Sequence, residues 1–192
     1  MTPSSSVISL VGMPGAGKTT IGKLLARRLD LKFADVDEAI EQLAGDSITT
    51  LFERQGEVEF RERESRALAE LVAGGPSVVA TGGGSILSPS NRALLVRTTV
   101  PVYLFATVDE LWRRVRTNSK RPLLRVQDPF ARLCEMFDQR HPLYCDVATI
   151  TVETRNAPAQ LVANQIVRQL VLRGSPASSR GSTVTDPKRP TP

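Results

Sequence analysis

The chain has 192 residues, of which 41% are hydrophobic and 23% charged, as expected for one packed domain of ordinary size with a short tail. A net charge of +5 is too small to indicate a nucleic-acid-binding protein, and two isolated cysteines with a single histidine argue against a zinc site or a disulfide framework. The apolar runs are too short to cross a bilayer and the N-terminus lacks the basic start of a signal peptide, so we expect a cytoplasmic protein that binds neither nucleic acid nor membrane.

Short apolar runs rich in β-branched residues alternate with segments of helical periodicity along the chain. In chain order the predictions are a strand at 7–11, a helix at 19–29, a strand at 32–35, helices at 37–44 and 49–72, strands at 77–81, 100–104 and 148–152, and a closing helix at 158–172. Further helices are predicted after Ser88, Thr107 and Asp128 as N-caps, with Thr107 and Glu110 forming a capping box. The helix at 49–72 is expected to be interrupted near Gly56.

This alternation predicts the class of fold and the extent of the domain. Strands separated by helices form parallel sheets covered on both faces, so we expect a three-layer α/β/α fold with a five-stranded parallel sheet. The folded domain is expected to span residues 1–173. Residues 174–192 are rich in Ser, Pro, Thr and Gly and are predicted to form a disordered tail.

The most specific motif lies between the first predicted strand and the first predicted helix. Gly12-x-x-x-x-Gly17-Lys18-Thr19 has the spacing of a phosphate-binding loop in the correct structural context. Backbone N–H groups of such a loop and the start of the helix attract phosphate oxygens. Lys18 is expected to reach the β and γ phosphates, and the Thr19 hydroxyl to ligate Mg²⁺. The loop predicts a bound nucleoside triphosphate and leaves the type of reaction open.

Two aspartates follow the second predicted strand. Asp35 and Asp37 stand at i and i+2, and strand alternation would place both carboxylates on one side, at the sheet edge where ligands bind. One could hold Mg²⁺ and the other could accept the proton of an attacking hydroxyl. The alternative is that both merely stabilise the start of a helix. The nearby phosphate loop favours the functional interpretation.

Glycines and cations later in the chain suggest a second binding region and a lid. Gly82-Gly83-Gly84 directly follows a predicted strand, which favours a substrate loop over a loose turn. Six basic residues lie within 113–125, where a helix passes into a loop broken by Pro122. We interpret this segment as a mobile lid over the nucleotide. A solvated helix face and an RNA-binding surface are the alternatives.

Local sequence patterns do not determine the roles of four further side chains. Phe52 and Phe60 are eight residues apart and are expected to share one helix face in the core. Arg61 and Arg140 could each be surface charges, and Arg61 in particular could be an exposed ion-pair partner.

Together these motifs resemble the shikimate kinase family over about residues 7–172. The segments that carry the resemblance are Gly12 to Thr19, Asp35-Val36-Asp37, Phe52 to Arg61, Gly82 to Gly84, Arg121-Pro122-Leu123-Leu124 and Arg140 to Tyr144. The resemblance implies transfer of the γ-phosphoryl group of ATP to the 3-hydroxyl of shikimate, in the chorismate branch of aromatic amino acid biosynthesis. It also implies the P-loop kinase fold with its mobile lid, and we expect a monomer.

The resemblance implies roles for the donor side of the site. Lys18 and the lid residue Arg121 would stabilise the transferring phosphoryl group. Thr19, and Asp35 through water, would hold Mg²⁺, the implied cofactor. Arg114 would stack on adenine near Pro158. The remaining implied contacts to ATP come from Gly15, Ala16, Gly17 and Thr20.

It also implies roles for the acceptor side. Asp37 would hold the shikimate hydroxyls and act as the base, while Arg61 and Arg140 would grip the shikimate carboxylate. Forked arginine donors suit a carboxylate, so the physical chemistry of these residues agrees with the implied roles. The remaining lining would come from Phe52, Phe60, Gly82, Gly83 and Gly84.

Two other functions are compatible with the phosphate loop. A gluconate or nucleotide kinase would share the fold, but Arg61, the triple glycine and Arg140 together fit the shikimate pattern. A regulatory or RNA-associated module would use the basic lid and would bind nucleotide without transferring a phosphoryl group.

Overall fold

The computed structural model describes residues 6–116, 127–155 and 157–174. The predicted lid around Arg121 and all of the predicted tail except Gly174 therefore lie outside the described residues. The strands are β1 (Val7–Val11), β2 (Lys32–Asp35), β3 (Ser77–Ala80), β4 (Thr99–Phe105) and β5 (Ile150–Glu153). The helices are α1 (Lys18–Leu29), α2 (Val36–Ala44), α3 (Ile48–Ala73), α4 (Pro89–Thr98), α5 (Val108–Val115), α6 (Pro129–Val147) and α7 (Ala159–Gly174), with a short 3₁₀ helix, η2 (Ser85–Leu87).

The five strands form one parallel sheet, as predicted. Their order is β2-β3-β1-β4-β5, and every neighbouring pair is parallel. β1 is central, with Ser9 opposite both Val79 of β3 and Pro101 of β4. Because all strands run the same way, the loops that follow β1, β2 and β3 meet at one edge of the sheet.

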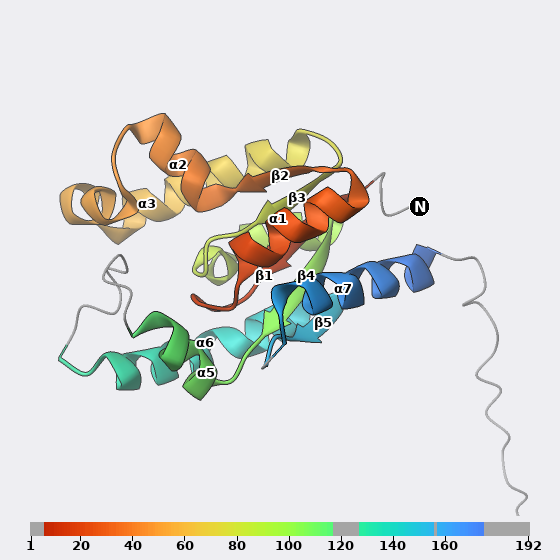
Figure 1. Ribbon diagram of the computed structural model, residues 1–192. Coiled ribbons are helices and arrows are strands. Elements are labelled where there is room, and N and C mark those ends of the chain that lie inside the picture. Colours follow the sequence, from red (N-terminus) through yellow and green to blue (C-terminus); the bar gives the residue numbers. More distant parts are fainter. Residues whose placement is uncertain (1–5, 117–126, 156, 175–192) are drawn as a thin grey trace, which may run out of the picture.

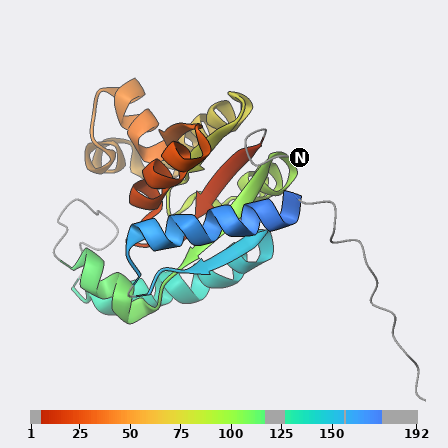
Figure 2. The ribbon, with the colours of Figure 1, turned by 45° about the vertical axis from the view of Figure 1, so that its right-hand side comes forward.

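Helices cover both faces of the sheet and complete the predicted three layers. α1 packs against α7, and the two lie side by side in front of the strands in Figure 2. On the other face, α4 packs on β4 and contacts α3 and α6. At the carboxyl edge of the sheet, α2 and the first part of α3 lie above the strand ends and α5 lies below them (Figure 1).

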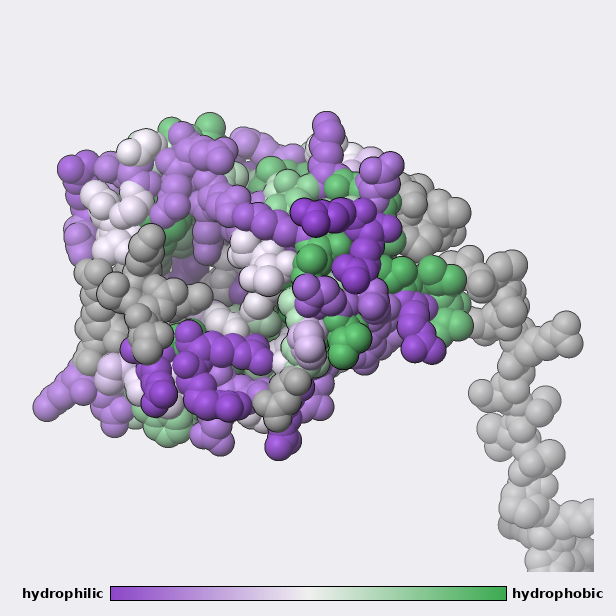
Figure 3. Space-filling view, viewed as in Figure 1, coloured by the Kyte–Doolittle hydropathy of each residue, from purple (hydrophilic) through white to green (hydrophobic). Residues whose placement is uncertain are grey.

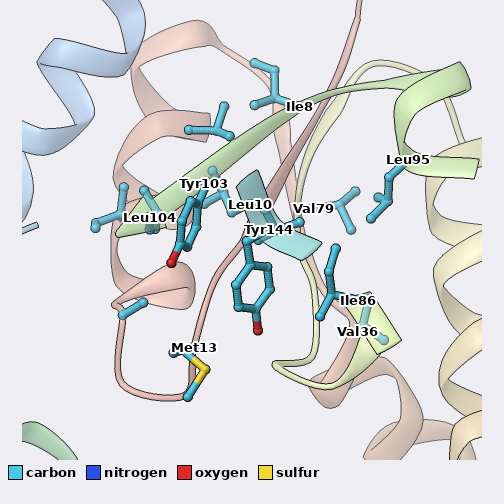
Figure 4. Packing of buried hydrophobic residues seen from close by; sticks show 14 of the residues in the cluster. Ile8, Leu10, Met13, Val36, Val79, Ile86, Leu95, Tyr103, Leu104 and Tyr144 are labelled. Carbon is cyan, nitrogen blue, oxygen red and sulfur yellow. The ribbon is translucent and has the colours of Figure 1, made fainter. Parts of the chain in front are cut away.

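The core lies on both sides of β1, whose residues are all buried. A strand that is buried on both faces is typically a continuous apolar run, and Val7–Val11 has this pattern except at Ser9. The buried Ser9 hydroxyl oxygen is 2.7 Å from that of Thr99. Tyr103 and Tyr144 stack with ring centroids 5.0 Å apart beside this strand (Figure 4). His141 joins this aromatic cluster, because its Nδ1 atom is 2.9 Å from the Tyr103 hydroxyl oxygen and its ring stacks on that of Phe137.

Two of the three predicted helix caps are confirmed. The Ser88 hydroxyl accepts a hydrogen bond from the Asn91 N–H, and the Asp128 carboxylate accepts one from the Ala131 N–H. The predicted capping box at Thr107 is wrong, because the Thr107 side chain makes no capping hydrogen bond. The carboxylate that should complete the box, that of Glu110, pairs instead with Arg113 at 3.3 Å.

The predicted interruption of the long helix is confirmed at Gly56. Its backbone angles are φ 78° and ψ 176°, a conformation that only glycine adopts easily. A Cβ atom added at this position would meet nothing within 4 Å, so the glycine is required by the backbone conformation alone. The kink divides α3 into a short arm that carries Phe52 and a longer helix that carries Phe60.

Replacing Gly56 by alanine should lower the free energy of unfolding by about 1–3 kcal/mol, because alanine resists this conformation. Urea denaturation measures the change. Gly74→Ala is the matched control at the other end of α3, since Gly74 has an ordinary φ of −72° and an added Cβ would be no closer than 3.4 Å to another atom. An equal loss in both variants would contradict the assignment of strain to Gly56.

No helix in the described part of the chain is both long and apolar enough to cross a bilayer. The face drawn in Figure 3 is mainly hydrophilic, and most of its hydrophobic residues lie on the right of the view, over α1 and along α7 to its C-terminal end. Val171 and Leu172 are exposed there.

Candidate functional site

The predicted phosphate loop joins β1 to α1 and is anchored in the core by two buried side chains, Met13 and Ala16. The Ala16 N–H donates to the Met13 carbonyl at 3.1 Å, which closes the turn. α1 begins at Lys18, and its N-cap, Gly17, offers no side chain to its first N–H groups. These N–H groups and the positive end of the helix therefore face the edge of the sheet, where an anion would be stabilised.

The Lys18 side chain folds back over this loop. Its ammonium group donates to the carbonyl oxygens of Gly12 at 2.7 Å and Met13 at 3.2 Å. These contacts hold the cation over the mouth of the loop, where a phosphate oxygen could replace a carbonyl as its partner.

A cavity of about 510 Å³ opens beside the phosphate loop and brings distant segments together. Residues 14–21 form one side of it, and Asp35, Asp37, Thr81 and Gly83 line it further along. The donor loop therefore shares this space with two of the predicted acceptor residues, Asp37 and Gly83. The other predicted acceptor residues do not line it: Phe52, Phe60, Arg61, Gly82, Gly84 and Arg140.

Asp35 and Asp37 both line this cavity, but the predicted reason was wrong. α2 begins at Val36, so Asp35 ends a strand and Asp37 lies in the first turn of a helix, where strand alternation does not apply. The Asp35 carboxylate accepts hydrogen bonds from the Asp37 N–H at 3.0 Å and from the Thr19 hydroxyl at 2.7 Å. Asp35 is thus the helix cap that was the alternative interpretation, and it also touches the phosphate loop.

The triple glycine follows β3 and is packed from three directions. A Cβ atom at Gly82 would collide with Glu64 and come within 3.0 Å of Asp37, and one at Gly83 would lie 2.9 Å from Pro14 of the phosphate loop. These contacts show that each glycine permits a close approach rather than forming a loose turn.

Gly84 is packed in the same way, because a Cβ atom there would collide with the guanidinium group of Arg61. The Gly83 carbonyl accepts hydrogen bonds from Arg140 Nη1 at 3.0 Å and from the Tyr144 hydroxyl at 2.7 Å. The loop is therefore the junction between the phosphate loop, α3 and α6.

The two predicted carboxylate-binding arginines differ in their electrostatic surroundings. Arg61 is not the exposed ion-pair residue that was one interpretation: its side chain is 21% exposed and pairs with Glu64 at 2.7 Å and Glu57 at 3.0 Å. Burial by itself lowers the pKa of Arg61, but the charge and hydrogen bond of Glu64, assisted by Glu57, outweigh burial and raise the pKa.

Arg140 is buried, against the interpretation of a surface charge, with only 3% of its surface exposed. Burial lowers its pKa, and the nearby cation Arg61 acts in the same direction. Among the described residues no carboxylate forms an ion pair with it, and its Nε atom has no hydrogen-bond partner. A buried cation without a paired anion is costly, so this position suits an anionic ligand.

Phe52 and Phe60 pack with ring centroids 4.3 Å apart. The predicted shared helix face is wrong, since the Gly56 kink lies between them. Phe60 is buried in the core as expected, and Phe52 is only partly buried against it. The Arg61 guanidinium carbon lies 5.8 Å and 5.4 Å from the two ring centroids. The rings therefore support the guanidinium group from one side.

Arg114 links α5 to the phosphate loop and to β5. It donates to the Thr154 carbonyl at 2.8 Å, to the Thr154 hydroxyl at 3.1 Å and to the Gly15 carbonyl at 3.3 Å. It lines the main cavity and a smaller neighbouring one of about 220 Å³. Pro158 precedes α7, and its neighbours Ala157 and Ala159 line the main cavity.

Three residues of the site were missed by the sequence analysis. Glu64 is three residues after Arg61, a spacing that places both on one helix face and could have revealed the pair. Tyr144 and Thr154 carry no such local signal, because their partners Gly83 and Arg114 are 61 and 40 residues away.

A phosphate loop after the central strand of this parallel sheet, opening into a shared cavity, defines a P-loop protein of the nucleotide-binding α/β class. The family model described as Shikimate kinase matches residues 14–171. The chain belongs to the shikimate kinase family.

Individual relatives are similar to this chain over most of their own length. The shikimate kinase of Nitrosospira multiformis is 47% identical over 86% of this chain and 85% of the relative, and that of Ralstonia nicotianae is 43% identical over 89% and 90%. Among solved structures, shikimate kinase from Acinetobacter baumannii in complex with shikimate is 41% identical, with a TM-score of 0.86 over 90% of this chain and 96% of that one.

Proposed function

We propose that this protein transfers the γ-phosphoryl group of ATP to the 3-hydroxyl of shikimate, giving shikimate 3-phosphate and ADP for aromatic amino acid biosynthesis. Family membership supports phosphoryl transfer from ATP to shikimate. The choice of acceptor rests on the guanidinium group of Arg140, which is buried and has no carboxylate ion-pair partner among the described residues. It contacts the triple-glycine loop that Arg61 also contacts. A small anionic polyol supplies the missing negative charge.

On the donor side, the backbone of residues 15–20 would surround the phosphates and Lys18 would exchange its carbonyl partners for β- and γ-phosphate oxygens. Arg114 would face adenine near Pro158, since it lines both cavities beside the loop. Arg121 is proposed as a second cation on the transferring group, brought by the lid. Positioning and charge neutralisation are the main contributions of a protein to phosphoryl transfer.

The residues present fit a magnesium ion. The Thr19 hydroxyl and the Asp35 carboxylate are 2.7 Å apart at the head of the phosphate loop, and hard oxygen ligands of this kind, few in number, suit Mg²⁺ bound to a nucleotide. Thr19 and Asp35 would hold the ion directly or through water. When bound, it would neutralise charge on the β- and γ-phosphate oxygens.

On the acceptor side, Asp37 would orient the 3-hydroxyl and accept its proton as that oxygen attacks the γ phosphorus. The bond from phosphorus to the bridging oxygen breaks, and ADP leaves with its electron pair. Arg61 and Arg140 would hold the substrate carboxylate from two sides of the triple glycine. Phe52 and Phe60 would form the apolar wall, and the tight packing at Gly82 would keep the ring close to Asp37.

The proposal extends to the location, the oligomeric state and the partners of the protein. We propose a cytoplasmic monomer whose partners are ATP and shikimate, without nucleic acid or membrane. The small net charge of +5 supports this, because nucleic-acid or membrane surfaces usually require a concentrated basic face.

ADP release in a coupled assay tests the function. With ATP and Mg²⁺ present, we expect turnover only after shikimate is added, and none with gluconate or AMP as the acceptor. Turnover that is independent of shikimate, or absent in its presence, would reject the proposed acceptor. Nucleotide binding without transfer to any of the three would favour a regulatory module.

Replacing Arg140 by alanine should raise the KM for shikimate at least about tenfold, because hydrogen bonds to a charged group contribute about 1.5–3 kcal/mol. The KM for ATP should change little. The same assay, with a thermal unfolding curve to verify folding, measures both constants. Arg132→Ala is the matched control on α6, where Arg132 forms a surface pair with Glu135. An unchanged KM for shikimate in a folded Arg140 variant would contradict the carboxylate assignment.

A further inference from the structure

The guanidinium group of Arg61 is held by two glutamates that differ sharply in exposure. Glu64 Oε2 accepts from Nη1 at 2.7 Å, and the Glu64 side chain is 2% exposed. Glu57 Oε1 accepts from Nη2 at 3.0 Å and from Nε at 3.3 Å, and the Glu57 side chain is 53% exposed. One acid is therefore part of the interior and the other lies at the surface.

The two glutamates accept from guanidinium N–H donors of Arg61 that a substrate carboxylate would need. A carboxylate binds arginine most strongly through two parallel hydrogen bonds along one edge of the guanidinium group. Glu57 lies on the edge formed by Nε and Nη2, and Glu64 takes a donor from the edge formed by Nη1 and Nη2. Each of the three guanidinium nitrogens of Arg61 thus already donates to a glutamate, and the guanidinium group lies against Gly84.

Only one of the two glutamates can move away from Arg61 at a small cost in free energy. Withdrawing Arg61 from Glu64 would leave a buried carboxylate without its partner, which is strongly unfavourable. Glu57 can rotate into water, where an exposed ion pair of this kind contributes little. Glu57 also follows the Gly56 kink directly, at the start of the longer part of α3.

We propose that Glu57 is an internal competitor of the substrate. Its carboxylate occupies the substrate position on Arg61 in the empty protein and is displaced when the carboxylate of shikimate binds, while Glu64 keeps the guanidinium group in place. The competition lowers substrate affinity and keeps Arg61 neutralised and correctly oriented between turnovers. This inference rests on the proposed function, because it requires shikimate as the acceptor.

Replacing Glu57 by glutamine in the full chain tests the competition. Glutamine keeps the size of the side chain and removes its charge, so the KM for shikimate should fall roughly two- to five-fold, the range that an ion pair of this strength permits. The value of kcat should stay within about twofold, since the γ phosphate and Asp37 are not touched. Glu59→Gln is the matched control, because Glu59 forms an i,i+4 pair with Arg63 at 3.1 Å on the same helix.

A second measurement separates competition for the carboxylate from a general change of the site. Shikimate methyl ester keeps the ring and lacks the charge, so its inhibition constant against shikimate should be the same in Glu57→Gln and the unmodified protein. An unchanged or raised KM for shikimate, or an equal gain with the ester, would overturn the inference. Failure of the proposed function looks different, since the unmodified protein would then show no shikimate-dependent ADP release.

Discussion

Replacing Lys18 by alanine should lower kcat by at least about a thousandfold. Removal of one preorganised donor from developing transition-state charge already costs about a hundred- to a thousandfold, and here the group lost carries a full charge. Its ammonium group is held over the mouth of the loop by the Gly12 and Met13 carbonyls, and in the proposed reaction it would contact the γ phosphate. Single-turnover transfer from ATP to shikimate measures the step directly.

Lys23→Ala is the control for this change. Lys23 lies on α1 one turn further along and forms an exposed pair with Glu38 at 3.1 Å, so its loss should leave kcat unchanged. A Lys18 variant that is folded and retains more than about a tenth of the kcat would remove this residue from the transfer step.

Replacing Asp37 by asparagine should lower kcat by about a hundred- to ten-thousandfold, the usual contribution of a positioned general base. The amide keeps the size of the side chain but cannot accept the proton of the 3-hydroxyl. ATP should bind with unchanged affinity, because the phosphate loop is untouched. Equilibrium titration with ATP and steady-state kinetics with shikimate separate the two effects.

The structure explains why the Asp37 variant should fold normally. The hydrogen bond that caps α2 uses the backbone N–H of Asp37 and the side chain of Asp35, so the substitution leaves it intact. Glu38→Gln, in the same helical turn, is the matched control and should show the kcat of the unmodified protein. If Asp37→Asn also does so, Asp37 is neither base nor positioning group.

The donor half of the site was predictable because its signal is local. The strand at 7–11, the glycine loop and the helix that follows are contiguous, and observed helix α1 begins one residue before the predicted one. The spacing of the loop glycines from Lys18 and Thr19 defines their placement without knowledge of the rest of the fold.

The acceptor half depends on contacts that the sequence does not display. From the sequence, Arg61 and Arg140 could be ordinary surface cations. Only the structure shows that Arg61 pairs with Glu64 and that Arg140 donates to the Gly83 carbonyl. Asp37 was assigned to the correct cavity by a strand argument that fails, since the chain turns into a helix at Val36. Burial and tertiary partners, rather than local propensity, determine these side chains.

The hydrogen bonds to the Gly83 carbonyl also have a consequence for folding during synthesis. This carbonyl is shared by Arg140 and Tyr144, which follow it by 57 and 61 residues, and the central strand β1 pairs only with later strands. A chain emerging from the ribosome therefore cannot assemble the acceptor end until α6 has been synthesised. Until β3 and β4 also arrive, the apolar β1 segment has no sheet partner, so nascent chains interrupted before that point should be candidates for chaperone binding.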